Sequence, residues 1–122
     1  MKIVLLGIAC LPIILFILSR FFVIVEICGE SMKPTFQGGE YVIGRKVLRK
    51  DRCRLNEIYV YYSPSPTSQQ RSIVVKRLIG VSNDSYFFEG DNPECSYDSR
   101  YYGYVDPSRV IAHIKEPKNK GK

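Results

Sequence analysis

The sequence has one histidine, no tryptophan, and four cysteines that do not form a Cys-x-x-Cys pair. The single histidine, His113, cannot complete a Cys/His zinc set, so we expect neither a metal nor a cofactor. No helix-turn-helix, zinc-finger or RNA-binding sheet motif is present, and nucleic acid is therefore not an expected partner. A length of 122 residues leaves room for one domain. These features exclude large multidomain enzymes, Rossmann-type dinucleotide folds and repeat arrays.

The first 25 residues contain a long apolar run. No charged residue stands between Ile3 and Ser19, and after Arg20 the run continues over residues 21–25. About 20 helical residues, at roughly 1.5 Å each, span the ~30 Å hydrocarbon core of a bilayer. No small-x-small cleavage site follows, and Cys10 lies too near the amino terminus for a lipoprotein signal. We therefore expect residues 1–20 to be a retained single-pass anchor, whose orientation the flanking charges do not decide.

Beyond the anchor, the pattern is that of β structure and predicts a domain over residues 21–114. Branched and aromatic residues recur in short segments separated by turn residues. The expected strands cover residues 21–27, 40–48, 57–62, 72–81, 85–89 and 105–114. Short strands at hairpin spacing predict an all-β core, either a small antiparallel β-barrel or a folded sheet. The basic tail, residues 115–122, is expected to be disordered.

Positive charge is concentrated in residues 45–54 and in the tail, within a total of 18 Lys+Arg against 12 Asp+Glu. Basic clusters attract phosphate, including that of lipid headgroups. One interpretation of residues 45–54 is a basic, lipid-facing hairpin of a non-catalytic, membrane-anchored binding module. The other is a solvated hairpin without a ligand. The sequence also leaves open whether Cys53 and Cys95 form a disulfide.

Three segments do not fit an ordinary strand or turn. In the first, residues 29–35 (Gly-Glu-Ser-Met-Lys-Pro-Thr), Ser31 stands between a flexible glycine and a rigid proline, directly after a strand. A serine nucleophile needs a base. The second segment, the hydrophobic residues 72–80, contains Lys76, which is the alternative to histidine as that base. If Lys76 faces inward, burial lowers the pKa of its amine and the neutral form can take a proton from Ser31. If it faces water, it is an ordinary surface lysine.

The third segment, residues 90–103, gathers short polar side chains around Arg100. Asp91, Asn92 and Asp98 supply carboxylate and amide groups at close spacing. Such a cluster holds a loop by Asx-type hydrogen bonds and an Asp–Arg pair. Its spacing does not match the twelve-residue calcium loop, so a metal is not expected here.

In this order, the three segments resemble the conserved boxes of the type I signal peptidases, a family of membrane-bound serine proteases with a Ser–Lys dyad. Residues 29–35 match the nucleophile box, residues 76–80 (Lys-Arg-Leu-Ile-Gly) the base box, and residues 90–103 the closing box. Residues 56–61 match an intermediate box. The resemblance extends from the anchor to about Ala112.

Three features distinguish this chain from many members of that family. The link between Lys76 and Gly90 is too short for the additional β-domain of the larger bacterial enzymes. The compact outline therefore resembles the mitochondrial inner-membrane type and the proteases that mature nickel superoxide dismutase. Cys95 stands where many members carry asparagine, and Gly29 stands where some carry a hydroxyl side chain.

The resemblance implies a role for each matching residue. Ser31 is expected to be the acylating nucleophile and Lys76 its general base, with the backbone N–H groups of Gly29 and Ser31 as the oxyanion hole. Ser96 is expected to orient the Lys76 amine, and Met32 to pack beneath the site. The residues expected to fix the closing loop without touching substrate are Asp91, Asn92, Asp98 and Arg100.

The resemblance also implies the activity, which is removal of N-terminal leader segments from protein substrates. A substrate is expected to lie extended along a sheet edge, with small residues before the cut. Membrane lipids would surround the anchor, and the catalytic domain would lie on the extracytoplasmic side. A protease dedicated to one pro-protein, of the nickel superoxide dismutase type, is the alternative.

Overall fold

The computed structural model describes residues 2–48, 51–64 and 72–118. Four parts of the sequence-based predictions fall outside this range. They are residue 1 of the anchor, Arg49 and Lys50 of the basic segment 45–54, residues 65–71 of the predicted domain, and residues 119–122 of the tail.

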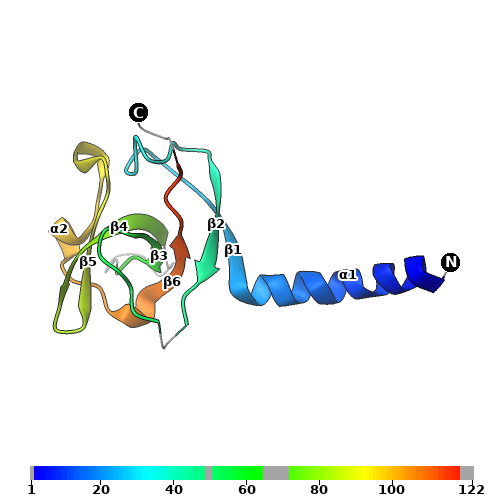
Figure 1. Ribbon diagram of the computed structural model, residues 1–122. Helices are drawn as coiled ribbons and strands as arrows, with labels where there is room; N and C mark the ends of the chain where they lie inside the picture. The colour runs from blue at the N-terminus through cyan, green and yellow to red at the C-terminus, as the bar shows by residue number, and fades with distance from the viewer. Residues whose placement is uncertain (1, 49–50, 65–71, 119–122) are drawn as a thin grey trace.

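The N-terminal apolar run forms one helix, α1, over Lys2–Phe21. Within it, Val4–Phe21 is long and apolar enough to cross a membrane, and none of this segment is buried against the rest of the chain. Figure 1 shows α1 projecting away from the sheet with the N-terminus at its far end. An exposed apolar helix of this length is a candidate membrane span.

The remainder is dominated by one antiparallel sheet with the strand order β1-β2-β6-β3-β4-β5. The strands are β1 Phe22–Glu26, β2 Tyr41–Lys46, β3 Ile58–Tyr62, β4 Ile73–Ser82, β5 Ser85–Glu89 and β6 Val110–Ile114. The expected all-β core behind one helix is confirmed, and of the two forms expected it is the folded sheet. Since β1 and β5 stand at opposite ends of the strand order, the sheet is not closed into a barrel.

The last predicted strand, residues 105–114, is too long. Only Val110–Ile114 is a strand, whereas Val105 forms an isolated bridge with Tyr86 and Pro107–Arg109 is a short 3-10 helix. Proline has no N–H to donate to a ladder, so the chain leaves the sheet at that point. The segment that matches the closing box, residues 90–103, is called the closing segment below. It contains a four-residue helix, α2 Ser99–Tyr102, which is too short to produce a helical period in the sequence.

The core lies on both faces of β3. Ile58 and Val60 belong to one hydrophobic cluster, and Tyr59 and Tyr61 to another. This follows from the alternation of side chains along a strand. Met32, from the turn that carries Ser31, is 1% exposed and belongs to the first cluster. The core therefore fixes the turn on which the candidate nucleophile lies.

Candidate active site

Ser31 lies on a turn directly after β1. Gly29 enters this turn with φ +80°, a conformation that glycine adopts without strain. The turn is closed by hydrogen bonds from the N–H of Lys33 to the carbonyl of Glu30 and from Phe36 to Met32, at 3.2 and 2.9 Å. Met32 and Phe36 are both buried in the core, so the turn that carries Ser31 is held in place.

Lys76 reaches Ser31 from the middle of β4. Its Nζ donates to the Oγ of Ser31 at 2.6 Å, and the residue is 6% exposed. Burial lowers the pKa of the Lys76 amine, and the negative charge of Asp98 opposes that shift. The two side chains line a cavity of about 160 Å³. Of the two orientations that the sequence left open for Lys76, the structure has the inward one.

The closing segment is bonded directly to the Ser31 turn. The N–H of Asn92 donates to the carbonyl of Ser31 at 2.8 Å, and the Asn92 amide donates to the carbonyl of Glu30 at 3.1 Å. A Cβ on Gly90 would overlap the Ser96 hydroxyl and come within 2.6 Å of the Ser31 carbonyl oxygen. Only glycine allows this close approach of the two segments.

Asp98 is the centre of the closing segment and is fully buried. It accepts hydrogen bonds from the Ser96 hydroxyl at 2.5 Å and the Gly90 N–H at 2.9 Å, and it pairs with Arg100 at 2.8 Å. Burial raises the pKa of Asp98, but the bonds from Arg100, Ser96 and backbone N–H groups outweigh it and lower the pKa overall. The hydroxyl of Ser96 thus donates to Asp98, and its action on Lys76 stays a prediction.

A second ion-pair network lies beside the first. Arg77 makes two bonds to Asp91, from Nε and one Nη at 2.8 Å each, and a further pair with Glu116 at 3.0 Å. Asp91 also accepts from the Thr35 hydroxyl at 2.5 Å, which ties the Ser31 turn to the closing segment. Burial raises the pKa of Asp91, and the bonds from Arg77 and Thr35 lower it below its usual value.

The candidate oxyanion donors are the backbone N–H groups of Gly29 and Ser31. Among residues 2–48, 51–64 and 72–118, no acceptor is bonded to the N–H of Gly29 or Ser31. Two unbonded N–H groups beside a serine hydroxyl can receive a carbonyl oxygen on which negative charge develops.

His113 lies away from Ser31, on β6. Its Nε2 is 3.3 Å from Glu57, and its ring packs at 5.2 Å from that of Tyr59. Over the described part of the chain, no cluster of His, Cys, Asp and Glu is suited to a metal ion. Cys53 and Cys95, whose pairing the sequence left open, are both free.

Sequence reasoning missed four residues that hold the site together: Arg77, Thr35, Gly90 and Glu116. Arg77 could have been found, because it follows Lys76 on a strand and must face the opposite side. Thr35 and Gly90 stand inside the matched boxes, but their contacts depend on how two distant segments meet. Glu116 stands in the tail, where the sequence offers no signal.

Comparison with known proteins finds a matching family model and a similar protein. A family model described as "Signal peptidase, peptidase S26" matches residues 1–85 and 81–117. The chain is 30% identical to the mouse (Mus musculus) protein named mitochondrial inner membrane protease subunit 1, with 75% of this chain covered. The matched part spans 66% of the length of that relative.

Proposed function

Because the chain belongs to the signal peptidase family, peptidase S26, we propose that it is a membrane-anchored serine endopeptidase that removes N-terminal leader segments. Ser31 is the nucleophile and Lys76 the general base. The observation that carries this proposal is the 2.6 Å contact between the Ser31 hydroxyl and a buried amine whose pKa is lowered. Burial disfavours the ammonium form of Lys76, and the neutral amine can act as the base that serine requires.

The reaction proceeds by acyl transfer. The Oγ of Ser31 attacks the scissile carbonyl carbon while its proton passes to the Nζ of Lys76. The carbonyl oxygen becomes negative and accepts hydrogen bonds from the N–H groups of Gly29 and Ser31. The Lys76 ammonium then protonates the leaving amine, which departs as the mature N-terminus. Water then gives a proton to the neutral Lys76 amine and attacks the acyl carbon. The bond from that carbon to the Ser31 Oγ breaks, the Oγ takes the proton back from Lys76, and the leader peptide is released.

The substrate lies between two free strand edges. β5 pairs with β4 only from Arg77 onward, so in the described residues no strand covers the outer edge of residues 73–76. β1 stands at the end of the strand order and also has a free edge. A mainly apolar cavity of about 250 Å³, lined by residues of both β1 and β4, adjoins the cavity beside Ser31. An extended peptide can bond to a free edge and place alternate side chains in such pockets.

The membrane anchor is α1, and the catalytic domain lies on the extracytoplasmic side of that membrane. The segment Val4–Phe21 can cross a bilayer by length and composition. The sheet begins at Phe22, the residue after the helix, so the active site is held near the membrane surface. Leader segments that are still embedded in the membrane are therefore within reach.

The decisive test removes one oxygen atom. Ser31→Ala in the full chain, reconstituted in lipid, should lower cleavage of a leader peptide by at least about 1,000-fold. The matched control is Ser82→Ala, an exposed serine at the end of β4, which should cleave at the wild-type rate. Turnover that persists in Ser31→Ala, in a preparation free of other peptidases, would contradict the proposal.

A panel of unrelated leader peptides then separates a general processing enzyme from one dedicated to a single pro-protein.

A further inference from the structure

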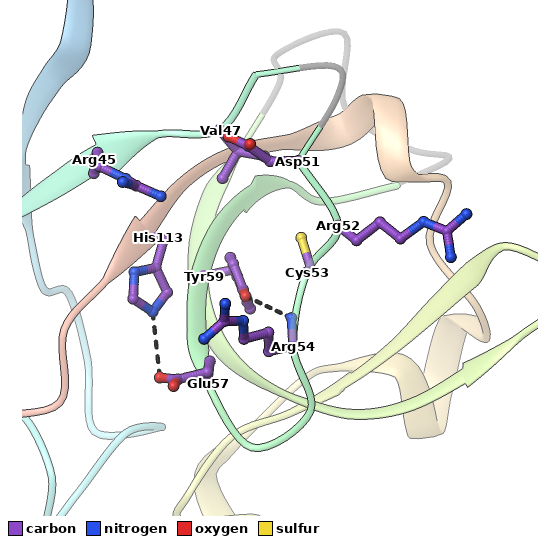
Figure 2. Close-up of a pocket in the computed structure, with 9 residues that line it drawn as sticks. All are labelled: Arg45, Val47, Asp51, Arg52, Cys53, Arg54, Glu57, Tyr59 and His113. Carbon is purple, nitrogen blue, oxygen red and sulfur yellow. Dashed lines mark hydrogen bonds and ion pairs between the residues drawn. The ribbon is translucent and has the colours of Figure 1, made fainter.

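Another cavity lies away from Ser31, on the sheet beneath the connection between β2 and β3. Its volume is about 490 Å³, and it is bordered by basic side chains, two carboxylates and an aromatic ring. The residues that carry the argument are Arg45, Arg52, Arg54, Glu57, Tyr59 and His113. Figure 2 shows Arg45 and Arg54 extending toward His113 from two sides, whereas Arg52 extends away from them.

Three arginines line this cavity against two carboxylates, so positive charge is in excess there. In the described residues no carboxylate pairs with the guanidinium of Arg45, Arg52 or Arg54. The two acidic side chains at the cavity are already engaged. Asp51 accepts from the N–H of Leu48 at 3.1 Å, and Glu57 pairs with His113 at 3.3 Å. Unpaired guanidinium groups directed at one space favour an anion.

Arg54 is held in place by a buried group. Its backbone N–H donates to the Tyr59 hydroxyl at 2.8 Å, and Tyr59 is 4% exposed. Arg45 projects from β2, where it lies beside His113 of β6 in the strand register. The cations on the two sides of the cavity thus come from positions that the sheet fixes.

The cavity is close to the end of the membrane span. Phe22, the first residue after α1, pairs with Arg45, and Arg45 pairs with His113. Since neighbouring strands are about 4.8 Å apart, the cavity begins roughly 5–10 Å from the point where the chain leaves the helix. Lys46 Nζ also donates to the carbonyl of Ser19 in the last turn of α1, at 2.9 Å.

The strand face beside the cavity is apolar and exposed. Ile24 and Ile43, which are paired across β1 and β2, are 71% and 66% exposed. Along β2, Arg45 alternates in phase with Ile43 and therefore lies on the same face. A basic cavity thus borders an exposed apolar face next to a membrane span. A lipid molecule has the complementary arrangement, with a phosphate group for the cavity and acyl chains for the apolar face.

We propose that this cavity binds the phosphate group of an anionic membrane lipid. The guanidinium groups of Arg45 and Arg54 donate to the phosphate oxygens in fork geometry, and His113 closes the third side. The proposal rests on the membrane anchorage given above, but not on the Ser31–Lys76 chemistry. Its role would be to fix the orientation of the catalytic domain on the membrane surface.

The single histidine gives a direct test. The full chain, labelled for NMR, is placed in phosphatidylcholine nanodiscs that contain increasing fractions of phosphatidylglycerol. The one imidazole signal, from His113, should shift and saturate as the anionic lipid is added. Arg45→Gln and Arg54→Gln should each raise the half-saturating lipid fraction about fivefold. Lys118→Gln removes the same charge from an exposed position outside the cavity, and should leave that fraction unchanged.

Several results would overturn the proposal. One is a His113 signal that is identical with and without anionic lipid. Another is an effect of Lys118→Gln as strong as that of the cavity variants, which would show general attraction between the basic surface and the lipid. A saturating shift with inorganic phosphate in neutral nanodiscs, and none with phosphatidylglycerol, would assign the cavity to a soluble anion. Should Arg54→Gln unfold, Arg45→Gln decides alone, because the Arg45 side chain makes no described hydrogen bond. Failure to enter nanodiscs would refute the anchorage, whereas peptide cleavage by the solubilised chain tests the protease proposal separately.

Discussion

Lys76 and Arg77 are consecutive cations on β4, yet their surroundings are opposite. The Nζ of Lys76 contacts a serine hydroxyl, no carboxylate pairs with it in the described residues, and burial lowers its pKa. Arg77 is bonded to the carboxylates of Asp91 and Glu116, and these bonds raise its pKa further above the ordinary arginine value. One cation is surrounded so that it can lose its proton, and the other so that it cannot.

The alternation of side chains along a strand produces this difference. Two neighbouring residues face opposite sides, so a single residue step separates a desolvated amine from a network of ion pairs. The arrangement places the Lys76 amine beside Ser31, while the adjacent guanidinium holds the closing segment through Asp91. The comparison teaches that the type of cation matters more than the number of charges here. The proposed mechanism needs one removable proton, at Lys76, and the closing segment is held by one permanent cation, Arg77.

Exchanging the two types of cation should have the largest effect. Lys76→Arg keeps the positive charge but cannot deprotonate at accessible pH, so cleavage should fall as completely as in Lys76→Ala, by at least about 1,000-fold. The matched change, Arg77→Lys, retains a cation beside Asp91 and should reduce kcat/KM far less. Rates on a leader peptide measure both. A Lys76→Arg enzyme with near-normal rates would show that Lys76 acts only as a charge.

The pH dependence of the wild-type enzyme should report the lowered pKa of Lys76. In the proposed mechanism the active form carries a neutral Lys76 amine, so kcat/KM should rise with pH and reach a plateau. Its midpoint should lie below the unperturbed lysine value of about 10.4, because burial disfavours the ammonium. A profile that falls with rising pH over the same range would contradict a neutral base. Arg77→Lys should leave the midpoint within about half a unit of wild type, since Arg77 faces the other side of β4.

Much of the fold could be predicted because the strands are short and bounded by turn residues. The predicted strand 85–89 is exact, and 57–62 is one residue too long. The strand predicted over residues 105–114 begins only at Val110, because Pro107 interrupts it. A proline is tolerated in a strand only where its missing N–H would have faced solvent, and the sequence does not show which side that is. The helix α2 was not predicted, because its N-cap residue, Asp98, is equally typical of a loop.

The two central side chains of the candidate site could be named from the sequence, but the contacts around them could not. Nothing in the order of residues indicates that Gly90 lies against Ser31, or that the Ser96 hydroxyl donates to Asp98. These contacts depend on how the closing segment packs over the Ser31 turn. The inward orientation of Lys76 was likewise open, because period-2 alternation fails in a segment that is apolar on both faces.

Removing the main partner of Arg77 should cost stability. Asp91→Asn leaves the guanidinium without its bidentate carboxylate and weakens the bond from Thr35. The Arg77 and Asp91 side chains are each 15% exposed, so we expect a loss of about 2 kcal/mol in the free energy of unfolding. Urea unfolding of the full chain in detergent measures it. A loss below about 0.5 kcal/mol would show that water replaces the carboxylate.

The same pair should make stability depend on acid. The pKa of Asp91 is lowered in the folded chain, so its contribution is present above the unfolded value of about 3.9. It is lost as pH falls through the lower folded pKa. Asp98 has the same sign, and the difference between wild type and Asp91→Asn isolates Asp91. That difference should shrink below about pH 4; a constant difference down to pH 2 would exclude a charge effect.

The smallest effect should come from the second partner of Arg77. Glu116 pairs with the guanidinium at 3.0 Å, but its side chain is 54% exposed, against 15% for Asp91. Water solvates the Glu116 carboxylate whether or not the pair forms, and the pair also orders a side chain near the end of the chain. Glu116→Gln should therefore cost about 0.5 kcal/mol or less, and added salt should remove most of that. Urea unfolding at low and high salt, beside Asp91→Asn, measures the contrast. A loss as large as that of Asp91→Asn, insensitive to salt, would mean that the segment after β6 holds Arg77 in place as firmly as the closing segment does.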